Sequence, residues 1–439
     1  MEFSFDRLDI GLAGVVLALL LLALRVQVGV ALGIVAFVGV SLVTSIAAAW
    51  GILTALPYDF VAQWSLSAIP MFLLMGYLAA NAGLTQGVFK SANILMGRVP
   101  GGLASATVVS SALFASASGS SVATAAAFSK IAVPEMLKAK YNPGLATGSV
   151  AAAGTLGALI PPSVLMILYG IFTDTSIGAL FIAGVIPGIL SALMYILMIT
   201  VRATITPSLA PISTVAYTRE EKRAAFKDIW PLPVLIIAVL AGIFTGVFTP
   251  TEAGAVGASM AALIAWFRRS LTYQAVMSAL TDTAVGTCTI FIVAIGASMF
   301  AAFMSLSTLP NVLGDFLMGS VDGPIAVILM ISVFIIILGM FIDAISILLL
   351  TIPIVAPVLI GLDVNLIWFG IIMIKLLEIG LITPPVGLNV YVIKSSLGNL
   401  VQLIEIFKGV GWFIFMDILV LLLLIAFPVL SLYLPELMR

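Results

Sequence analysis

Two short segments that interrupt apolar stretches of this chain carry the same pattern of glycine and proline. Residues 157–162 read Gly-Ala-Leu-Ile-Pro-Pro, and residues 380–385, which lie 223 positions later (380 minus 157), read Gly-Leu-Ile-Thr-Pro-Pro. Proline removes a backbone donor and disrupts a helix, so carbonyl groups about one turn earlier are left free. Such carbonyls at the end of a half-helix suit a cation, whereas the start of the next half-helix suits an anion. Each segment is therefore a candidate binding element; the alternative is a proline kink that only bends a helix.

A serine-rich segment at residues 116–121 (Ser-Ala-Ser-Gly-Ser-Ser) interrupts another apolar stretch. Small residues in such a place can serve only to let helices pack closely. Several serines around one glycine also offer hydroxyl and carbonyl oxygens, which are hard ligands that can hold Na⁺ without a buried carboxylate. The pattern favours a cation or substrate site over packing alone.

Ionisable residues inside apolar segments are functional by default, unless they are paired. Lys375 and Glu378 stand three residues apart, so they share a helix face and are expected to neutralise one another. Asp343 is expected at the apex of a further interrupted stretch, where it could face a cavity. Glu252 follows Thr249 by three residues, and this order is more typical of a helix N-terminal cap than of a binding site.

The elements that position these residues must lie in a membrane. Of 439 residues, 62% are hydrophobic and 8% are charged, and the mean hydropathy is +1.29. A soluble protein of this size could not bury so much apolar surface. We therefore predict an all-α polytopic membrane protein in contact with membrane lipid.

The composition also excludes several kinds of chemistry. There is no histidine and Cys288 is the only cysteine, which excludes disulfides within the chain, histidine bases, histidine-ligated metals and haem. No Gly-Lys pair occurs, so the chain has no P-loop for ATP. A net charge of −1 gives no reason to expect nucleic acid. The first nine residues are not basic, so we expect residues 10–24 to be a retained helix rather than a cleaved signal.

Apolar runs of sufficient length predict the membrane-spanning helices. They lie at about 9–26, 28–50, 66–83, 144–171, 177–203, 231–247, 250–267, 284–306, 367–393 and 409–435. Two further stretches, 102–137 and 324–360, are long but interrupted. Each could be two full helices or a hairpin that enters and leaves on one side.

The charges that flank these two stretches decide between the alternatives. Lysine and arginine favour cytoplasmic loops, and Arg98 and Lys138 flank the first stretch. Acidic residues flank the second (Asp315, Asp322 and Asp363). We predict two re-entrant helical hairpins that open on opposite sides, and hence inverted repeats with broken helices. The alternative is two unrelated helix pairs with a chance motif match.

This interpretation divides the chain into five regions. They are scaffold helices (1–83), a first repeat with hairpin 102–137 and broken helix 144–171 (84–203), a cytoplasmic loop with scaffold helices (204–283), a second repeat with hairpin 324–360 and broken helix 367–393 (284–398), and a C-terminal helix (399–439).

Together these motifs resemble the large membrane subunit of TRAP (tripartite ATP-independent periplasmic) transporters. The resemblance covers nearly the whole chain. It is carried by residues 116–121, 157–170, 248–254, 339–343 and 378–389.

The resemblance implies a transporter and not an enzyme. Members of the family import organic anions, commonly carboxylates or sulfonates, across the cytoplasmic (inner) membrane of bacteria and archaea, coupled to Na⁺. A periplasmic substrate-binding protein delivers the solute, and a small four-helix membrane subunit braces the large one. Hairpins and broken helices form the moving part of an elevator-type transporter. Because this chain starts directly with the large-subunit pattern, a separate small subunit is implied.

The resemblance also implies site residues. The first Na⁺ site would use Ser118, Ser121, Gly157, Ile160 and Pro162. The second would use Gly339, Gly380, Thr383 and Val386. Candidate contacts to the anion, near the hairpin tips and half-helix starts, are Ser120, Pro161, Ser163, Asp343, Pro384 and Asn389.

One departure bears on the solute. Many members that carry dicarboxylates or sialic acid have an asparagine before the second break, where residues 374–379 here read Ile-Lys-Leu-Leu-Glu-Ile. The nature of the organic anion therefore stays open. Three rival functions also stay open: a standalone Na⁺-coupled carrier, an intramembrane enzyme and a passive channel.

Overall fold

The computed structural model describes residues 6–84, 87–97, 99–212, 218–320 and 323–438. All regular secondary structure in these ranges is helical, which confirms the predicted fold class. Arg98 and Asp322, two of the charges used to orient the hairpins, lie outside the described residues.

The helices follow one another in this order. Those of the first half are α1 (Arg7–Ala23), α2 (Val28–Val43), α3 (Ile46–Val61), η1 (Trp64–Ser67), α4 (Ala68–Asn81), α5 (Val88–Met96), α6 (Gly102–Ser118), α7 (Ser121–Lys138), α8 (Pro143–Leu159), α9 (Val164–Phe172) and α10 (Ile177–Ile205). Those of the second half are η2 (Pro207–Leu209), α11 (Arg219–Ile229), α12 (Pro231–Phe244), α13 (Pro250–Phe267), α14 (Tyr273–Ser307), α15 (Leu309–Ser320), α16 (Pro324–Gly339), α17 (Ala344–Gly361), α18 (Leu366–Ile382), α19 (Leu388–Leu397), α20 (Leu403–Ala426) and α21 (Val429–Glu436).

Several of these helices can cross a bilayer. Within the described ranges, five are long and apolar enough to do so, or up to seven spans if each of two bent pairs, α8–α9 and α11–α12, counts as one. Large apolar side chains face outward on these helices: Leu193 of α10 and Ile237 of α12 are 57% and 64% exposed. Lipid is the surrounding that such surfaces require, and the chain is a multi-pass membrane protein.

The internal repeat extends from the motifs to the helix boundaries. A shift of 223 residues carries α7 exactly onto α17 and α8 exactly onto α18. The caps repeat as well: Asn142 accepts hydrogen bonds from two backbone N–H groups at 2.9 and 3.2 Å, and Asn365 does the same at the same distances. Asparagine is a preferred N-cap residue, so both broken helices start with the same local device.

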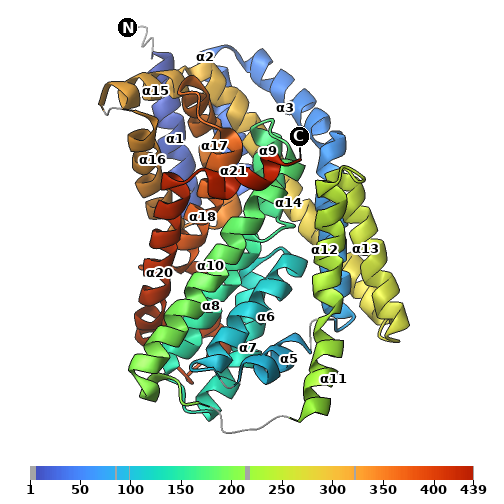
Figure 1. Cartoon of the computed structure of the whole chain (residues 1–439). Coiled ribbons are helices and arrows are strands. Elements are labelled where there is room, and N and C mark those ends of the chain that lie inside the picture. The colour runs from blue at the N-terminus through green and yellow to red at the C-terminus, as the bar shows by residue number, and fades with distance from the viewer. Residues whose placement is uncertain (1–5, 85–86, 98, 213–217, 321–322, 439) are drawn as a thin grey trace.

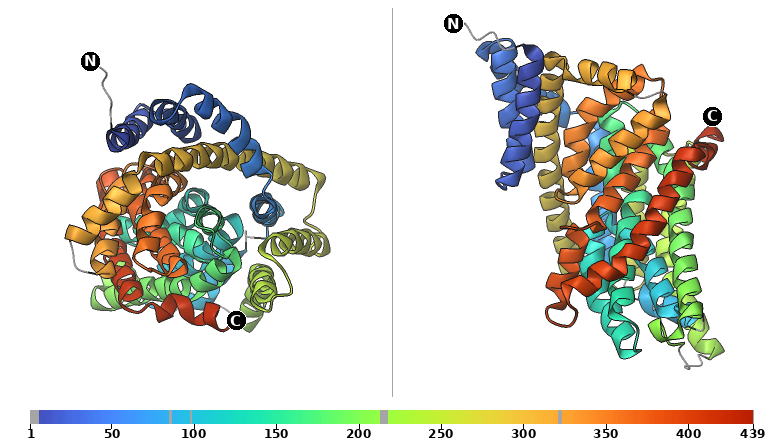
Figure 2. Two further views of the ribbon diagram at one scale, coloured as in Figure 1. Left: turned by 90° about the horizontal axis from the view of Figure 1, so that it is seen from above. Right: turned by 90° about the vertical axis from the view of Figure 1, so that its left-hand side faces the viewer.

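The two hairpins enter the molecule from opposite ends. Figure 1 shows α6 and α7 in the lower half and α16 and α17 in the upper half; α8 packs against the first pair and α18 against the second. An arc of helices, in which α14 packs against α2 and α4, lies on one side of the hairpins (Figure 2). The 35 residues of α14 make it the longest helix in the described part of the chain.

Several predicted segments differ from the observed helices. Residues 28–50 are not one helix, because the chain breaks at Thr44 and Ser45 caps α3 by accepting from the N–H of Ala48 at 3.2 Å. The predicted segment 284–306 covers only the C-terminal two thirds of a longer helix, α14. The predicted segment 409–435 is divided at Pro428 into two helices, α20 and α21. The short helices α5, α11 and α15 were not predicted.

The start of α13 confirms the predicted cap. Thr249 Oγ1 accepts from the N–H of Glu252 at 3.3 Å, and Glu252 Oε2 accepts from the N–H of Thr249 at 2.8 Å. Replacing Thr249 with alanine should lower the free energy of unfolding by about 1 kcal/mol, because it removes the hydroxyl oxygen that accepts the hydrogen bond from the Glu252 N–H. The check is thermal unfolding of the purified protein, with Ser259→Ala on the same helix as the control. Equal melting temperatures for the two variants would contradict this role.

Candidate functional site

The tips of both hairpins line one cavity of about 290 Å³. The first tip contributes residues 118–122 and the second contributes residues 343–345. The arc of helices closes the other side through Leu73 and Tyr77 of α4 and Thr289 of α14. The remaining lining residues are Ala158, Val164, Leu165, Gly286, Ile290, Leu381 and Leu388.

The first tip turns the chain and starts a helix at the cavity. Gly119 adopts a left-handed conformation (φ +63°), and Ser120 caps α7 by accepting from the N–H of Ala123 at 3.2 Å. Ser118 Oγ lies 3.2 Å from Thr124 Oγ1 and also reaches the Ala115 carbonyl at 3.4 Å. The tip therefore presents hydroxyl groups together with the positive end of α7.

The second tip repeats this arrangement with a carboxylate. Asp343, which the 223-residue shift relates to Ser120, caps α17 by accepting from the N–H of Ser346 at 3.1 Å and from the Ser346 hydroxyl. It is the only charged residue among those that line the cavity. No lysine or arginine is among the described residues that line this space, so an anion here would have to be held by hydroxyl groups, backbone N–H groups and the start of α7.

Glycines allow each broken helix to approach its hairpin closely. A β-carbon on Gly157 would lie 2.3 Å from the β-carbon of Ala115, and one on Gly380 would lie 2.5 Å from Cα of Gly339. Real contacts are not that short, so glycine is required at the second contact, where backbone meets backbone. The structure thus brings the proposed ligands Gly339 and Gly380 together.

The two breaks are alike in backbone but differ in exposure. Ile160 and Thr383 are the C-caps of α8 and α18, and both have extended backbone angles. A cis peptide bond joins the two prolines in each break. Pro161 and Pro162 are buried, whereas Pro384 and Pro385 are exposed. Thr383 Oγ1 donates to the Ile379 carbonyl at 2.6 Å.

Contacts around the breaks join them to the tips. The half-buried Val386 precedes Gly387, whose N–H donates to the Met340 carbonyl at 3.3 Å and so links the second break to the second tip. At the first break, Ser118 and Pro162 line a space of about 10 Å³. This is about the size that one water molecule requires. Among the residues that the structure describes, no group of three or more acidic or cysteine side chains could hold a metal ion.

Some predicted substrate contacts lie away from the cavity. Ser163 stands at the N-cap position of α9 without a side-chain cap bond; it is fully enclosed, and its hydroxyl has no hydrogen-bond partner. Asn389 is buried against α8, where its Nδ2 donates to the Ala151 carbonyl at 3.5 Å. Neither residue lines the cavity, and nor do Pro161 and Pro384. Ser118, Ser120, Ser121 and Asp343 do line it.

A second group of ionisable residues lies outside the cavity. Lys375 Nζ is 3.3 Å from Glu378 Oε2, which confirms the predicted pair. It is closer, at 2.6 Å, to Asp417 Oδ1 on α20, a partner that the sequence analysis missed. The sequence contains an indication of this partner, because Asp417 is the only acidic residue within the apolar segment 409–426. All three side chains are fully buried.

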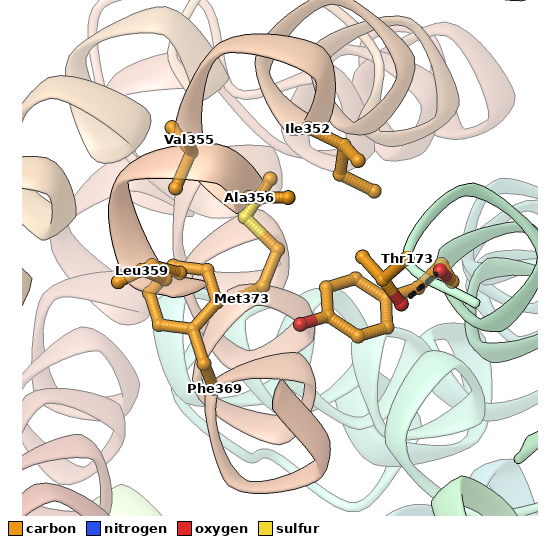
Figure 3. Close-up of a pocket in the computed structure, with 8 residues that line it drawn as sticks. Thr173, Ile352, Val355, Ala356, Leu359, Phe369 and Met373 are labelled. Carbon is orange, nitrogen blue, oxygen red and sulfur yellow. Dashed lines mark hydrogen bonds between the residues drawn. The ribbon is translucent and has the colours of Figure 1, made fainter. Parts of the chain in front are cut away.

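Other spaces among the described residues are lined mainly by apolar side chains. Figure 3 shows a narrow pocket where Val355, Ala356 and Leu359 of α17 face Phe369 and Met373 of α18, with Thr173 beside them. Its volume is about 10 Å³, and the nearby Tyr169 hydroxyl donates to the Leu366 carbonyl at 2.7 Å. Here α9 of the first repeat packs against the second repeat, and the pocket is a packing gap rather than a site for an organic molecule.

Comparisons with known proteins point to one family. Residues 15–430 match the family model described as "Tripartite ATP-independent periplasmic transporter, DctM component". The chain is 36% identical to the C4-dicarboxylate TRAP transporter large permease protein DctM of Pseudomonas aeruginosa, over 85% of this chain and 87% of that protein. It is 33% identical to the sialic acid TRAP transporter large permease protein SiaM of Vibrio cholerae, with the same coverage.

A solved structure shares the fold at low sequence identity. The YdaH transporter of Alcanivorax borkumensis superposes with a TM-score of 0.60 at 17% identity, over 86% of this chain and 88% of that one. At this identity the likeness concerns the fold alone.

Proposed function

This chain belongs to the DctM component family of tripartite ATP-independent periplasmic transporters, and we propose that it is the large permease subunit of a Na⁺-coupled importer of an organic anion. A carboxylate or sulfonate is the proposed solute class. The observation that carries the proposal is that both hairpin tips line one shared cavity, beside the two broken helices.

Na⁺ is the coupling ion that the donor groups suit best. The tips and breaks offer hydroxyl and carbonyl oxygens, and Na⁺ accepts several neutral oxygens. We place the first ion between Ser118, Ser121 and the first break, and the second between Gly339 and the second break. The close contacts at Gly157 and Gly380 support this arrangement, because they bring each break to its own hairpin.

The anion would bind between the occupied ion sites. The cavity has no cationic side chain, so two bound Na⁺ ions would supply the positive charge that it otherwise lacks. The start of α7 and the hydroxyls of the first tip would orient the anionic group, because the start of α17 is already capped by the Asp343 carboxylate. Solute binding would thus depend on Na⁺, which is what coupling requires.

We propose that the hairpins and broken helices move as an elevator against the arc of helices that includes α4 and α14. The cavity lies at the boundary of these two parts, because α4 and α14 contribute Leu73, Tyr77 and Thr289 to its lining. A small four-helix membrane subunit would brace the arc, and a periplasmic binding protein would deliver the solute to the outer face of the bacterial inner membrane.

Uptake by proteoliposomes tests the proposed function. They would contain this chain with the small subunit, and uptake of a labelled C4-dicarboxylate, sialic acid or sulfonate would be followed with and without the binding protein. Uptake driven by an inward Na⁺ gradient, and lost when K⁺ replaces Na⁺, is the expected result. Uptake without the binding protein would favour a standalone carrier, and flux that ignores the Na⁺ gradient would favour a channel.

A further inference from the structure

Three helices meet at Lys375 through charged and polar contacts. Its ammonium lies 2.6 Å from Asp417 Oδ1 on α20, 3.2 Å from Ser191 Oγ on α10 and 3.3 Å from Glu378 Oε2 on its own helix, α18. The hydroxyl of Tyr195, also on α10, donates to Asp417 Oδ1 at 2.5 Å. All of these side chains are fully buried, and none lines the cavity between the tips.

Stability alone does not explain this cluster. Charged groups are expensive at membrane depth, and a buried ion pair is often no more stable than well-packed apolar residues of the same volume. One oxygen of Glu378 and one of Asp417 have no hydrogen-bond partner, so the cluster is not even fully satisfied. An ion pair, unlike hydrocarbon, selects a specific partner. A buried ammonium that loses its carboxylate is left uncompensated, so the pair limits how far its two helices can rotate relative to one another.

The rotation of α18 matters because of what its other side contacts. Lys375 and Gly380 are five residues apart, which is about 140° around an α-helix. On that other side Gly380 meets Gly339 backbone to backbone. The helix is therefore held from two sides, by α20 and α10 at Lys375 and by α16 at Gly380. A small rotation of α18 would separate the two glycines and turn the carbonyls of the second break.

We infer that the Lys375–Asp417 ion pair, with Tyr195 and Ser191, is a positioning clasp that sets the rotation of α18 and so the geometry of the second Na⁺ site. Lys375 and Asp417 touch neither the ion nor the solute; they act through Gly380 and Thr383. Glu378 bonds Lys375 within the same helix and lies against the Leu159 backbone of α8, so it does not tie α18 to α20 or α10. The inference rests on the proposed Na⁺-coupled function.

Two variants that change charge equally separate this role from others. Asp417→Asn and Glu378→Gln each replace one buried carboxylate by an amide of the same shape, and each leaves Lys375 with one carboxylate partner. Only Asp417→Asn removes the carboxylate charge from the contact between α18 and α20. The hydrogen bond from Trp368 Nε1 to the Leu424 carbonyl, which also joins these two helices, stays in both variants. Asp417→Asn should raise the Na⁺ concentration for half-maximal uptake on the order of tenfold, the usual range for residues that orient metal ligands. Glu378→Gln should change it less than twofold.

The measurement is uptake rate against Na⁺ concentration in proteoliposomes, with thermal unfolding of each variant as a check on folding. Tyr195→Phe removes one hydrogen bond to Asp417 and no charge, so it should raise the Na⁺ concentration for half-maximal uptake by a smaller factor. This variant replaces Asp417→Asn in the test if Asp417→Asn folds poorly. If both carboxylate variants raise the Na⁺ concentration for half-maximal uptake equally, the cause is the loss of a buried negative charge and not the loss of helix positioning. That result would contradict the inference. Unchanged Na⁺ dependence in Asp417→Asn and Tyr195→Phe, with lower stability alone, would also overturn it. If uptake by the wild-type protein ignores Na⁺, the proposed function fails instead.

Discussion

Replacement of Gly380 by alanine is expected to reduce Na⁺-driven uptake to background. The added β-carbon would lie 2.5 Å from Cα, 2.9 Å from the carbonyl carbon and 3.2 Å from the carbonyl oxygen of Gly339. All three are backbone atoms, so no side-chain rotation can relieve the contact, and α16 and α18 must separate. Overpacking of this kind costs about 1–3 kcal/mol in stability. A displacement of about 1 Å at a site can reduce its function roughly 100-fold.

Gly411→Ala is the matched control for this substitution. Gly411 lies on α20, where an added β-carbon meets nothing within 4 Å. Alanine is the better helix former by about 1 kcal/mol, so this variant should be as stable as the wild type or more so, with unchanged uptake. The comparison uses initial uptake rates normalised to the amount of reconstituted protein. Full Na⁺-driven uptake by Gly380→Ala would mean that the second break is not part of an ion site.

The second large effect is expected from the double variant Ser118→Ala/Ser121→Ala. Both residues lie at the first tip and line the cavity, and Ser118 also lines the small space beside Pro162. Removing hydroxyl oxygens from a site made of neutral ligands should weaken Na⁺ binding. Since changes to residues that merely support a metal site typically reduce affinity 10–100-fold, the Na⁺ concentration for half-maximal uptake should rise about tenfold or more. Uptake should recover at high Na⁺ concentration.

Ser110→Ala provides the control for the serine variants. Ser110 lies on the same hairpin, is buried and donates to the Ala106 carbonyl at 2.5 Å, but it does not line the cavity. Its Na⁺ dependence should match that of the wild type. An unchanged Na⁺ dependence in the double variant would remove Ser118 and Ser121 from the first site and would return the serine-rich tip to a packing role.

Local signals in the sequence predicted the interrupted helices well. The paired prolines that follow a glycine located both breaks, at residues 157–162 and 380–385, and the cap at Thr249 and Glu252 formed as expected. A lone proline was a weaker signal, since Pro134 and Pro187 lie inside helices. The division of residues 28–50 was missed, because the run is apolar throughout and only Ser45 hints at a new helix start.

Contacts between residues that are far apart in the chain could not be predicted from the sequence alone. Tyr195 and Asp417 are 222 positions apart, and the residues around each one do not indicate that the two will be in contact. The pair of Lys375 and Glu378 was predictable because its members share one helix face, whereas the third member of the cluster depends on how α20 packs against α18. Asn389 illustrates the same limit: its polar side chain suggested a ligand contact, but it faces α8.

The assignments of individual residues to the two ion sites stay predictions. The structure places Ser118 and Ser121 at one tip and joins Gly339 to Gly380 at the other. The inverted arrangement of the two hairpins explains how one cavity can border both breaks, because each hairpin reaches the middle of the molecule from its own end (Figure 1).

Coupled movement of Na⁺ and the organic anion is the most direct test of the central claim. Proteoliposomes with this chain, the small subunit and the binding protein would have equal Na⁺ on both sides, radioactive sodium outside and a fixed membrane potential. An inward gradient of the organic anion would then be imposed. The account predicts net Na⁺ entry that requires the anion and disappears in Gly380→Ala. Anion entry at the same rate without net Na⁺ movement would contradict it.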